Sequence, residues 1–271
     1  MKDGSLSDVY SRSFGAGPRR VLAVHCSLAH SGAWRGLADA LQDEITLTAF
    51  DMYSHGRSPD WDETGDYQTA NVEAGLALLE AEPEPVDLIG HSFGATVALR
   101  MAQARPEKVR SLVLIEPVLF AVTRAEAPEL QAALEAQEAP FNALFQAGEV
   151  EQATRLFNRM WGTGEPKWSD LPEPARAAMV RAMQAVPKSY EVLYLDTKGV
   201  LEPGALAPVE MPVLLLSGAE SQPVMPLINE GLARRLTQAR CEVVEGAGHM
   251  LPITHAGITA GLLNRFWSDL G

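Results

Sequence analysis

The chain has 271 residues, 46% of them hydrophobic and 21% charged, and its 22 Lys and Arg against 35 Asp and Glu give a formal net charge of −13. This composition is typical of a globular protein with a sizeable core, and a charge of this sign would repel the phosphate backbone of a nucleic acid. No apolar stretch approaches the roughly 18 residues that span a bilayer, and the polar N-terminal segment lacks the apolar centre of a signal peptide, so we expect no membrane association and a cytoplasmic protein.

Short apolar runs alternate with longer amphipathic segments in the first half of the chain. The apolar runs predict strands at 20–25, 45–52, 86–90 and 109–115. The segments between them predict helices at 33–41, 71–81 and 95–104. Strands of this length separated by helices are typical of a parallel sheet that is covered by helices on both faces.

The alternation stops after the fourth predicted strand. From 117 to about 208 the chain is rich in Ala, Glu, Gln, Met and Leu at helical spacing, which predicts an all-helical insertion of about four helices. Strand patterns resume at 213–216 and 241–244, and a last helix is expected at 256–270. We therefore expect a core formed by residues 1–118 and 209–271, and a helical cap formed by residues 119–208.

Cysteine and histidine usage gives no sign of a disulfide or a metal site. Cys26 and Cys241 both fall in segments with the pattern of buried strands or strand ends, which favours small apolar side chains over a disulfide. The six histidines lack a paired ligand spacing such as HExxH. We expect neither a metal nor a disulfide.

The pentapeptide GHSFG at 90–94 lies between a predicted strand and a predicted helix. In this setting the pattern Gly-x-Ser-x-Gly places a serine nucleophile on a tight turn. Its two glycines permit a turn that side chains would block, and the helix that follows aims free N–H groups at negative charge forming nearby. Ser92 is therefore the candidate nucleophile; the alternative is a glycine-rich turn whose serine caps the helix.

A serine nucleophile needs a general base, and His249 fits best by position. It lies in the glycine-rich loop EGAGHM directly after the predicted strand 241–244, at a strand end where a site above a sheet would form. The alternative is a loop histidine that bonds to solvent. The other histidines, which lie in less suitable settings, are His25, His30, His55, His91 and His255.

Two backbone N–H groups are expected to bind the oxygen that becomes negative during attack. One should belong to Phe93, the residue after the nucleophile, and the other to the loop after the strand at 20–25. We assign the second donor to Ser27, with Leu28 as the alternative. Each donor of this kind contributes on the order of 10²–10³ in rate.

These segments together resemble the α/β-hydrolase superfamily, in the branch with a helical cap over the site. The matching features are the His25 loop with Trp34 downstream, the turn DMYSHGRS at 51–58, the GHSFG elbow and the GAGHM loop. The resemblance implies an α/β fold with an eight-stranded, mostly parallel sheet, a Ser-acid-His triad in that chain order, a covalent acyl-enzyme and no cofactor. One departure is Cys26, which stands where the family usually has glycine.

The triad acid is the second departure. In the commonest family pattern an aspartate lies three residues after the glycine of the strand LLLSG, and here that place, counted from Gly218, holds Ser221. Some members resembling this fold, including haloalkane dehalogenases, carry the acid at the end of the strand at 109–115, where this chain has Glu116. We favour Glu116, because a strand-end carboxylate is buried and fixed; Glu220 and the absence of a working acid remain the alternatives.

The serine at the elbow excludes haloalkane dehalogenases and epoxide hydrolases, which resemble this chain but use an aspartate there. We expect a serine hydrolase that cleaves a small, largely apolar carboxylic ester, with a small molecule as its partner. The alternatives are a C–C bond hydrolase or cofactor-free perhydrolase with the same triad, and a catalytically inactive member that binds a hydrophobic ligand. The residues expected to contact the substrate are Leu28, Val118, Phe120, Met160, Trp161 and Met250.

Overall fold

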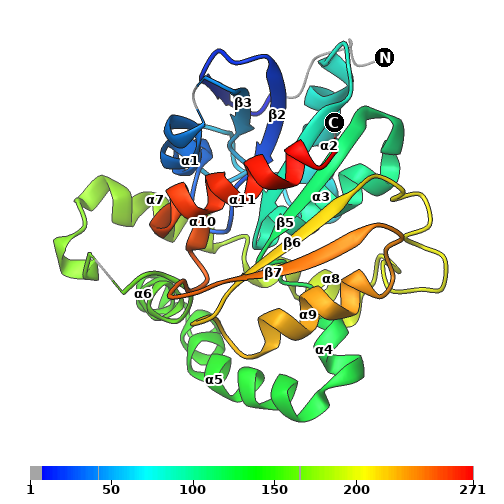
Figure 1. Cartoon of the computed structure of the whole chain (residues 1–271). Coiled ribbons are helices and arrows are strands. Elements are labelled where there is room, and N and C mark those ends of the chain that lie inside the picture. The colour runs from blue at the N-terminus through cyan, green and yellow to red at the C-terminus, as the bar shows by residue number, and fades with distance from the viewer. Residues whose placement is uncertain (1–7, 42, 165, 271) are drawn as a thin grey trace.

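Seven strands form one sheet in the described parts of the chain, residues 8–41, 43–164 and 166–270 of the computed structural model (Figure 1). The strands are β1 (Ser11–Phe14), β2 (Arg19–Val24), β3 (Ile45–Phe50), β4 (Val86–His91), β5 (Val109–Ile115), β6 (Val213–Gly218) and β7 (Ala239–Val244). Their order in the sheet is β1-β3-β2-β4-β5-β6-β7. The pair β1 and β3 is antiparallel and every other neighbouring pair is parallel, which confirms the predicted mostly parallel sheet.

The sheet differs from the prediction at the edge that β1 forms. The resemblance implied eight strands, whereas the described residues form seven. β1 itself was not predicted, because its sequence SRSF buries only Phe14 and carries no apolar run. Residues 8–10, directly before β1, are bend and coil, so the described chain adds no further strand at this edge.

Helices connect the strands and supply the layers on both faces. The α-helices are α1 (Arg35–Ala40), α2 (Tyr67–Ala81), α3 (Phe93–Ala104), α4 (Ala121–Glu126), α5 (Pro128–Gln146), α6 (Val150–Trp161), α7 (Glu173–Met183), α8 (Tyr190–Leu195), α9 (Val224–Ala233), α10 (Leu251–Thr254) and α11 (Ala256–Ser268). Short 3₁₀ turns are η1 (Ser31–Trp34), η2 (Pro106–Lys108), η3 (Trp168–Asp170) and η4 (Pro187–Ser189).

Alternate residues of the central strands point to opposite faces of the sheet, as the pleat of a strand requires. In β5, Leu112 and Leu114 belong to the core cluster that also contains side chains of α2, α3 and α9. Val113 and Ile115 belong to the cluster that contains side chains of α1 and α11. Because both faces are covered, the central strands contain continuous buried apolar runs, such as 112–115 and 213–216, which is why the sequence reveals them.

Between β5 and β6 the described chain contains no strand, as the helical spacing predicted, and has the five α-helices α4–α8 where about four were expected. We call residues 119–208 the cap segment. Helices α5 and α6 pack against each other, and α4 packs against α9 of the core. Figure 1 shows α4, α5 and α6 grouped away from both ends of the chain. The division of the chain into a core and a cap domain stays a prediction.

The two cysteines differ in burial. Cys26 is buried, as expected, but Cys241 is exposed. The reason is that β7 is the last strand of the sheet, so part of it faces solvent. Across the described residues, no helix combines the length and apolar character needed to cross a bilayer, and no three His, Cys, Asp or Glu side chains form a possible metal site.

Candidate active site

Ser92 lies on a strained turn between β4 and α3. Its φ of 56° is in the left-handed region that side chains disfavour. The two flanking glycines make this turn possible, because a Cβ atom on Gly90 would lie 2.4 Å from the carbonyl oxygen of Gly94. A Cβ atom on Gly94 would lie 2.3 Å from the carbonyl oxygen of His25. The elbow therefore packs directly against the end of β2, and its serine is 6% exposed.

A continuous series of hydrogen bonds runs from Ser92 through His249 to Glu116. The Oγ atom of Ser92 lies 2.9 Å from Nε2 of His249, and Nδ1 of His249 lies 2.8 Å from Oε2 of Glu116. An ionised carboxylate only accepts hydrogen bonds, so Nδ1 carries the proton and Nε2 is free to accept the serine proton. The structure thus brings together the predicted nucleophile, the predicted base and the favoured acid.

Glu116 is completely buried and is held by three donors. Besides His249, the backbone N–H of Gly218 donates to its Oε1 at 2.7 Å and the hydroxyl of Ser221 donates to the same atom at 2.8 Å. Ser221 occupies the place where the family usually has its aspartate. Glu220, the alternative acid, is exposed and contributes its backbone N–H to the carbonyl of Ala247. The carboxylate that reaches the histidine is the one at the end of β5.

His91, inside the elbow, supports the loop of the candidate base. Its Nε2 donates to the carbonyl oxygen of His249 at 2.8 Å, and the two rings lie 5.4 Å apart. Burial lowers the pKa of His91 to about 3, so this ring stays neutral at physiological pH. It fastens the two loops of the site to each other without a charge.

The N–H groups of Phe93, Ser27 and Leu28 differ in whether they already have a hydrogen-bond partner. The N–H of Phe93 is the first of α3, so it has no partner within the helix. The N–H of Leu28 is already used, because it donates to Nε2 of His55 at 3.1 Å. The N–H of Ser27 has no hydrogen-bond partner among the described residues. Of the two alternatives in this loop, Ser27 is therefore the one left available to a ligand.

A cavity of about 540 Å³ opens beside Ser92 and His249. It is lined by five of the six residues that the sequence suggested for substrate contact: Leu28, Val118, Phe120, Trp161 and Met250. Met160 is not on the cavity wall and packs against the apolar core instead. Neighbouring residues of a helix point about 100° apart, so a sequence pattern that locates α6 near the site does not tell which of the pair faces the cavity.

The sequence did not predict a polar group that lines the same cavity. Glu138 of α5 accepts a 2.6 Å hydrogen bond from the hydroxyl of Tyr194, and both residues line the cavity. Burial raises the pKa of Glu138 and the hydrogen bond from Tyr194 lowers it; the effect of burial is the larger, and the pKa rises to about 7. A lone glutamate on an amphipathic helix gives no sequence signal of this kind, since most such residues face water.

Replacing Glu138 with glutamine is expected to stabilise the protein at pH 8 and to leave its stability near pH 4.5 almost unchanged. An unfolded chain releases this proton near the ordinary value of 4.5, whereas the folded protein keeps it until about 7. Between these values the folded state binds more protons, so the free energy of unfolding of the natural protein falls as the pH rises. We expect a gain of about 1–2 kcal/mol at pH 8, measured by urea unfolding. An equal gain at both pH values would contradict this explanation.

Comparisons with known proteins place the chain among hydrolases. Residues 21–261 match the model of a family described as the alpha/beta hydrolase family. A lipase of Mycobacterium tuberculosis, LipV, is 42% identical over 116 residues, which are 42% of this chain and 43% of that protein. A pimeloyl-(acyl-carrier protein) methyl ester esterase of Methylococcus capsulatus is 29% identical over 272 residues, covering 95% of this chain and 98% of that protein.

Solved structures show the same fold at lower sequence identity. The crystal structure of a hydrolase from Pseudomonas aeruginosa PA01 is 21% identical and covers 96% of this chain and 94% of its own, with a TM-score of 0.73. Cfl2 from Burkholderia cenocepacia is 20% identical and covers 97% and 93%, also with a TM-score of 0.73. At this identity the likeness concerns the fold alone.

Proposed function

The chain belongs to the alpha/beta hydrolase family, and from this premise we propose that it is a serine esterase with Ser92, His249 and Glu116 as its catalytic residues. The observation that carries the proposal is the unbroken series of hydrogen bonds between these three side chains at the wall of a cavity. The names of the relatives, a lipase and methyl ester esterases, support an ester as the substrate.

The geometry suits acyl transfer in two steps, formation of an acyl-enzyme on Ser92 and its hydrolysis. As Ser92 Oγ attacks the ester carbonyl, His249 takes the hydroxyl proton across the 2.9 Å contact. The carboxylate of Glu116 stabilises the imidazolium that forms. The N–H groups of Phe93 and Ser27 bind the oxyanion of the tetrahedral intermediate. His249 then gives the proton to the departing alcohol and activates the water that releases the acid from Ser92.

The cavity favours a small or medium ester with a largely apolar arm. The ring of Trp161 lies 4.9 Å from that of His249 at an edge-on angle. The ring of Phe120 lies 6.0 Å from that of Trp161. These rings, with Val118 and Leu28, form apolar walls next to the reacting atoms. The volume of about 540 Å³ falls within the usual range of ligand pockets.

The cap segment supplies most of the cavity wall, so we propose that it sets the choice of substrate. We place the cap domain at 119–208 and the core at 1–118 and 209–271, as the sequence suggested. Among the lining residues, Phe120, Phe141, Phe157, Trp161, Leu193 and Tyr194 all come from the cap segment. A change of acyl preference is therefore expected from substitutions in the cap, not in the sheet.

The reason to consider an inactive, ligand-binding member was the missing aspartate after Gly218. The contact between Glu116 and His249 supports an active enzyme over this alternative, because in our proposal it supplies the carboxylate from another strand. The same three side chains would also serve C–C bond cleavage or peracid formation. Assays on a dienoate ketone and for peracid formation, run beside the ester assay, separate these reactions.

The proposal is tested with a short-chain p-nitrophenyl ester and a fluorophosphonate probe. We expect a burst of p-nitrophenol as the acyl-enzyme forms, and a covalent label on Ser92 that mass spectrometry locates. A series of esters with graded acyl lengths, methyl esters included, should show a falling kcat/KM once the acyl chain exceeds the cavity. The absence of both burst and label would contradict the assignment.

A further inference from the structure

Two loops beside the site are joined by a reciprocal pair of histidine contacts. Loop 25–30 follows β2, and loop 51–60 follows β3. His25 accepts a hydrogen bond at Nε2 from the N–H of Met52, at 3.0 Å, and His55 accepts one at Nε2 from the N–H of Leu28, at 3.1 Å. Each loop thus provides an imidazole that fixes one peptide group of the other.

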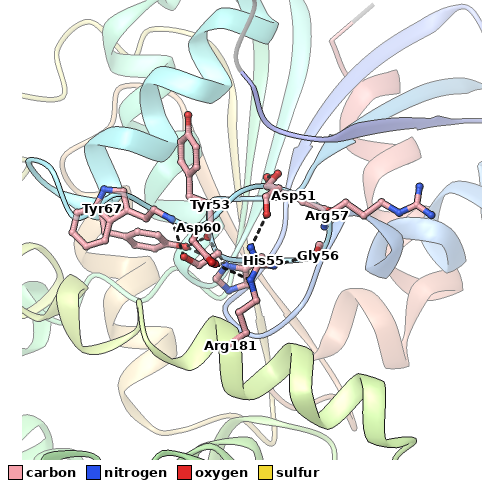
Figure 2. A network of polar contacts seen from close by, with 11 residues as sticks. Asp51, Tyr53, His55, Gly56, Arg57, Asp60, Tyr67 and Arg181 are labelled. Atoms are coloured by element: carbon pink, nitrogen blue, oxygen red, sulfur yellow. Dashed lines mark hydrogen bonds and ion pairs between the residues drawn. The ribbon is translucent and has the colours of Figure 1, made fainter.

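The contacts of Nδ1 fix the tautomer of His55 that can accept the hydrogen bond from Leu28. Its Nδ1 donates to the carbonyl oxygen of Tyr53 at 2.9 Å, and the hydroxyl of Tyr67 lies 3.1 Å from the same nitrogen (Figure 2). The proton is therefore on Nδ1, which leaves Nε2 as an acceptor. Burial lowers the pKa of His55 to about 4, so the ring is neutral at physiological pH.

The contact occupies the N–H of Leu28 and so distinguishes it from the N–H of Ser27. Leu28 has a φ of 61°, in the left-handed region that residues with a side chain disfavour. Its N–H points to His55, while the N–H of Ser27 has no partner among the described residues. A hydrogen bond of 3.2 Å from the N–H of Ala29 to the carbonyl oxygen of Cys26 closes this turn. Within the turn, His55 is the acceptor that fixes the peptide N–H of Leu28.

Arg181 joins the cap segment to the same loop. Arg181 of α7 donates to the carbonyl oxygens of Gly56 and Ser58, at 3.2 and 2.7 Å, and to the carboxylate of Asp60 at 2.7 Å. Figure 2 shows Arg181 extending from the cap helix to the loop that carries His55. Gly56 is the next residue after His55, so the cap contacts the loop directly beside the imidazole.

We propose that His55 is a positioning residue for the oxyanion hole and that Arg181 makes this positioning depend on the cap segment. The inference rests on the proposed function, since it assumes that Ser27 and Phe93 bind the oxyanion. In this proposal, Arg181 of α7 fixes the position of loop 51–60, and His55 of that loop fixes the N–H of Leu28. The orientation of the Leu28 peptide then determines the direction of the neighbouring Ser27 N–H. Neither His55 nor Arg181 touches the reacting atoms.

Two substitutions at His55 form a matched pair. His55→Gln keeps an amide oxygen near the place of Nε2, whereas the shorter side chain of His55→Asn reaches only the place of Nδ1. We expect His55→Asn to lower kcat about 10- to 100-fold with KM within about threefold. The reason is that a misplaced Ser27 N–H weakens the hydrogen bond to the oxyanion in the transition state more than it weakens binding of the ester. His55→Gln should recover most of this loss.

Phenylboronic acid gives a readout that a purely structural role would not move. Its tetrahedral adduct with Ser92 places an oxygen in the oxyanion hole, so its inhibition constant should rise in parallel with the fall in kcat/KM. An inhibition constant and a kcat unchanged in a folded His55→Asn variant would overturn the proposal.

Arg181→Met tests the cap, with Lys188→Met as its control. Lys188 also joins the cap segment to the core, by an ion pair of 3.2 Å with Glu63, but in the described chain it makes no hydrogen bond to loop 51–60. We expect Arg181→Met to lower kcat and to weaken boronate binding about three- to tenfold, and Lys188→Met to change both less than twofold. Equal behaviour of the two variants would overturn the role of the cap.

Failure of the underlying function would look different. In that case the natural protein itself would show no Ser92-dependent burst and no inhibition by phenylboronic acid, and both proposals would fall together. If His55→Asn did not fold, the comparison of Arg181→Met with Lys188→Met would decide, because both side chains are partly exposed and their loss leaves the core intact.

Discussion

Replacing Ser92 with alanine is expected to lower kcat on a short-chain ester by at least about 10⁴-fold. The variant keeps the cavity walls and the N–H groups of Phe93 and Ser27, so it still binds the ester and polarises its carbonyl. It lacks the oxygen that forms the acyl-enzyme, and only a water molecule can attack. The burst of p-nitrophenol and the fluorophosphonate label should both disappear.

Ser13→Ala provides the matched control for this substitution. Ser13 is an exposed residue of β1, at the edge of the sheet, where its hydroxyl lies 3.0 Å from that of Thr48. Its loss should leave turnover and labelling as they are in the natural protein. Turnover by Ser92→Ala above about one-tenth of the natural rate would mean that another group cleaves the ester.

The position of Ser92 could be predicted because everything that defines it is local. A buried strand, two glycines and a helix start follow one another within a short stretch, and the structure shows why each glycine is needed. His249 was found in the same way, from a glycine-rich loop after a strand. Where the chemistry depends on one turn of the chain, the sequence carries enough information to place it.

The partners of these residues depend on contacts between distant segments. Glu116 and Glu220 are both near strand ends, and only the parallel pairing of β5 with β6 puts the N–H of Gly218 beside Glu116. A sequence does not show this pairing directly. The prediction of Glu116 therefore rested on the burial expected at a strand end, while Glu220 remained open.

His55 and Met160 show the same limit in two further ways. His55 lies in the turn at 51–58, whose resemblance to the family gave its histidine no role, and its contact with Leu28 joins two loops 27 residues apart. Met160 lies next to Trp161 on α6, and a rotation of about 100° separates a cavity residue from a core residue. Packing between elements, not periodicity within one, determines both outcomes.

Replacing Glu116 with glutamine is expected to lower kcat about 10³–10⁴-fold. The carboxylate accepts from Gly218 and Ser221 at Oε1 and from His249 at Oε2. A glutamine would turn its oxygen to the two donors on one side, and its NH₂ group would then face Nδ1 of His249. The imidazole would have to carry its proton on Nε2, which points at Ser92 and cannot then accept the serine proton.

Glu220→Gln is the matched control, because it makes the same chemical change at an exposed side chain two residues after Gly218. It should change kcat less than about twofold, within the small effects usual for exposed positions. The two variants are compared by kcat on one ester at neutral pH, with thermal unfolding as a check on folding. A large loss in Glu220→Gln with little change in Glu116→Gln would reverse the assignment of the acid.

Ser221 allows the carboxylate to be moved instead of merely removed. Its hydroxyl lies 2.8 Å from Oε1 of Glu116, so an aspartate at 221 would bring a carboxylate into the space that Glu116→Ala leaves empty. We expect the double variant Glu116→Ala, Ser221→Asp to recover at least about tenfold of the kcat lost in Glu116→Ala, because orientation of His249 is restored from a different strand. Ser221→Asp alone should lower kcat, since two carboxylates would share one buried site. If the double variant is as slow as Glu116→Ala while its unfolding midpoint matches that of the natural protein, the role of Glu116 depends on more than a negative charge beside Nδ1.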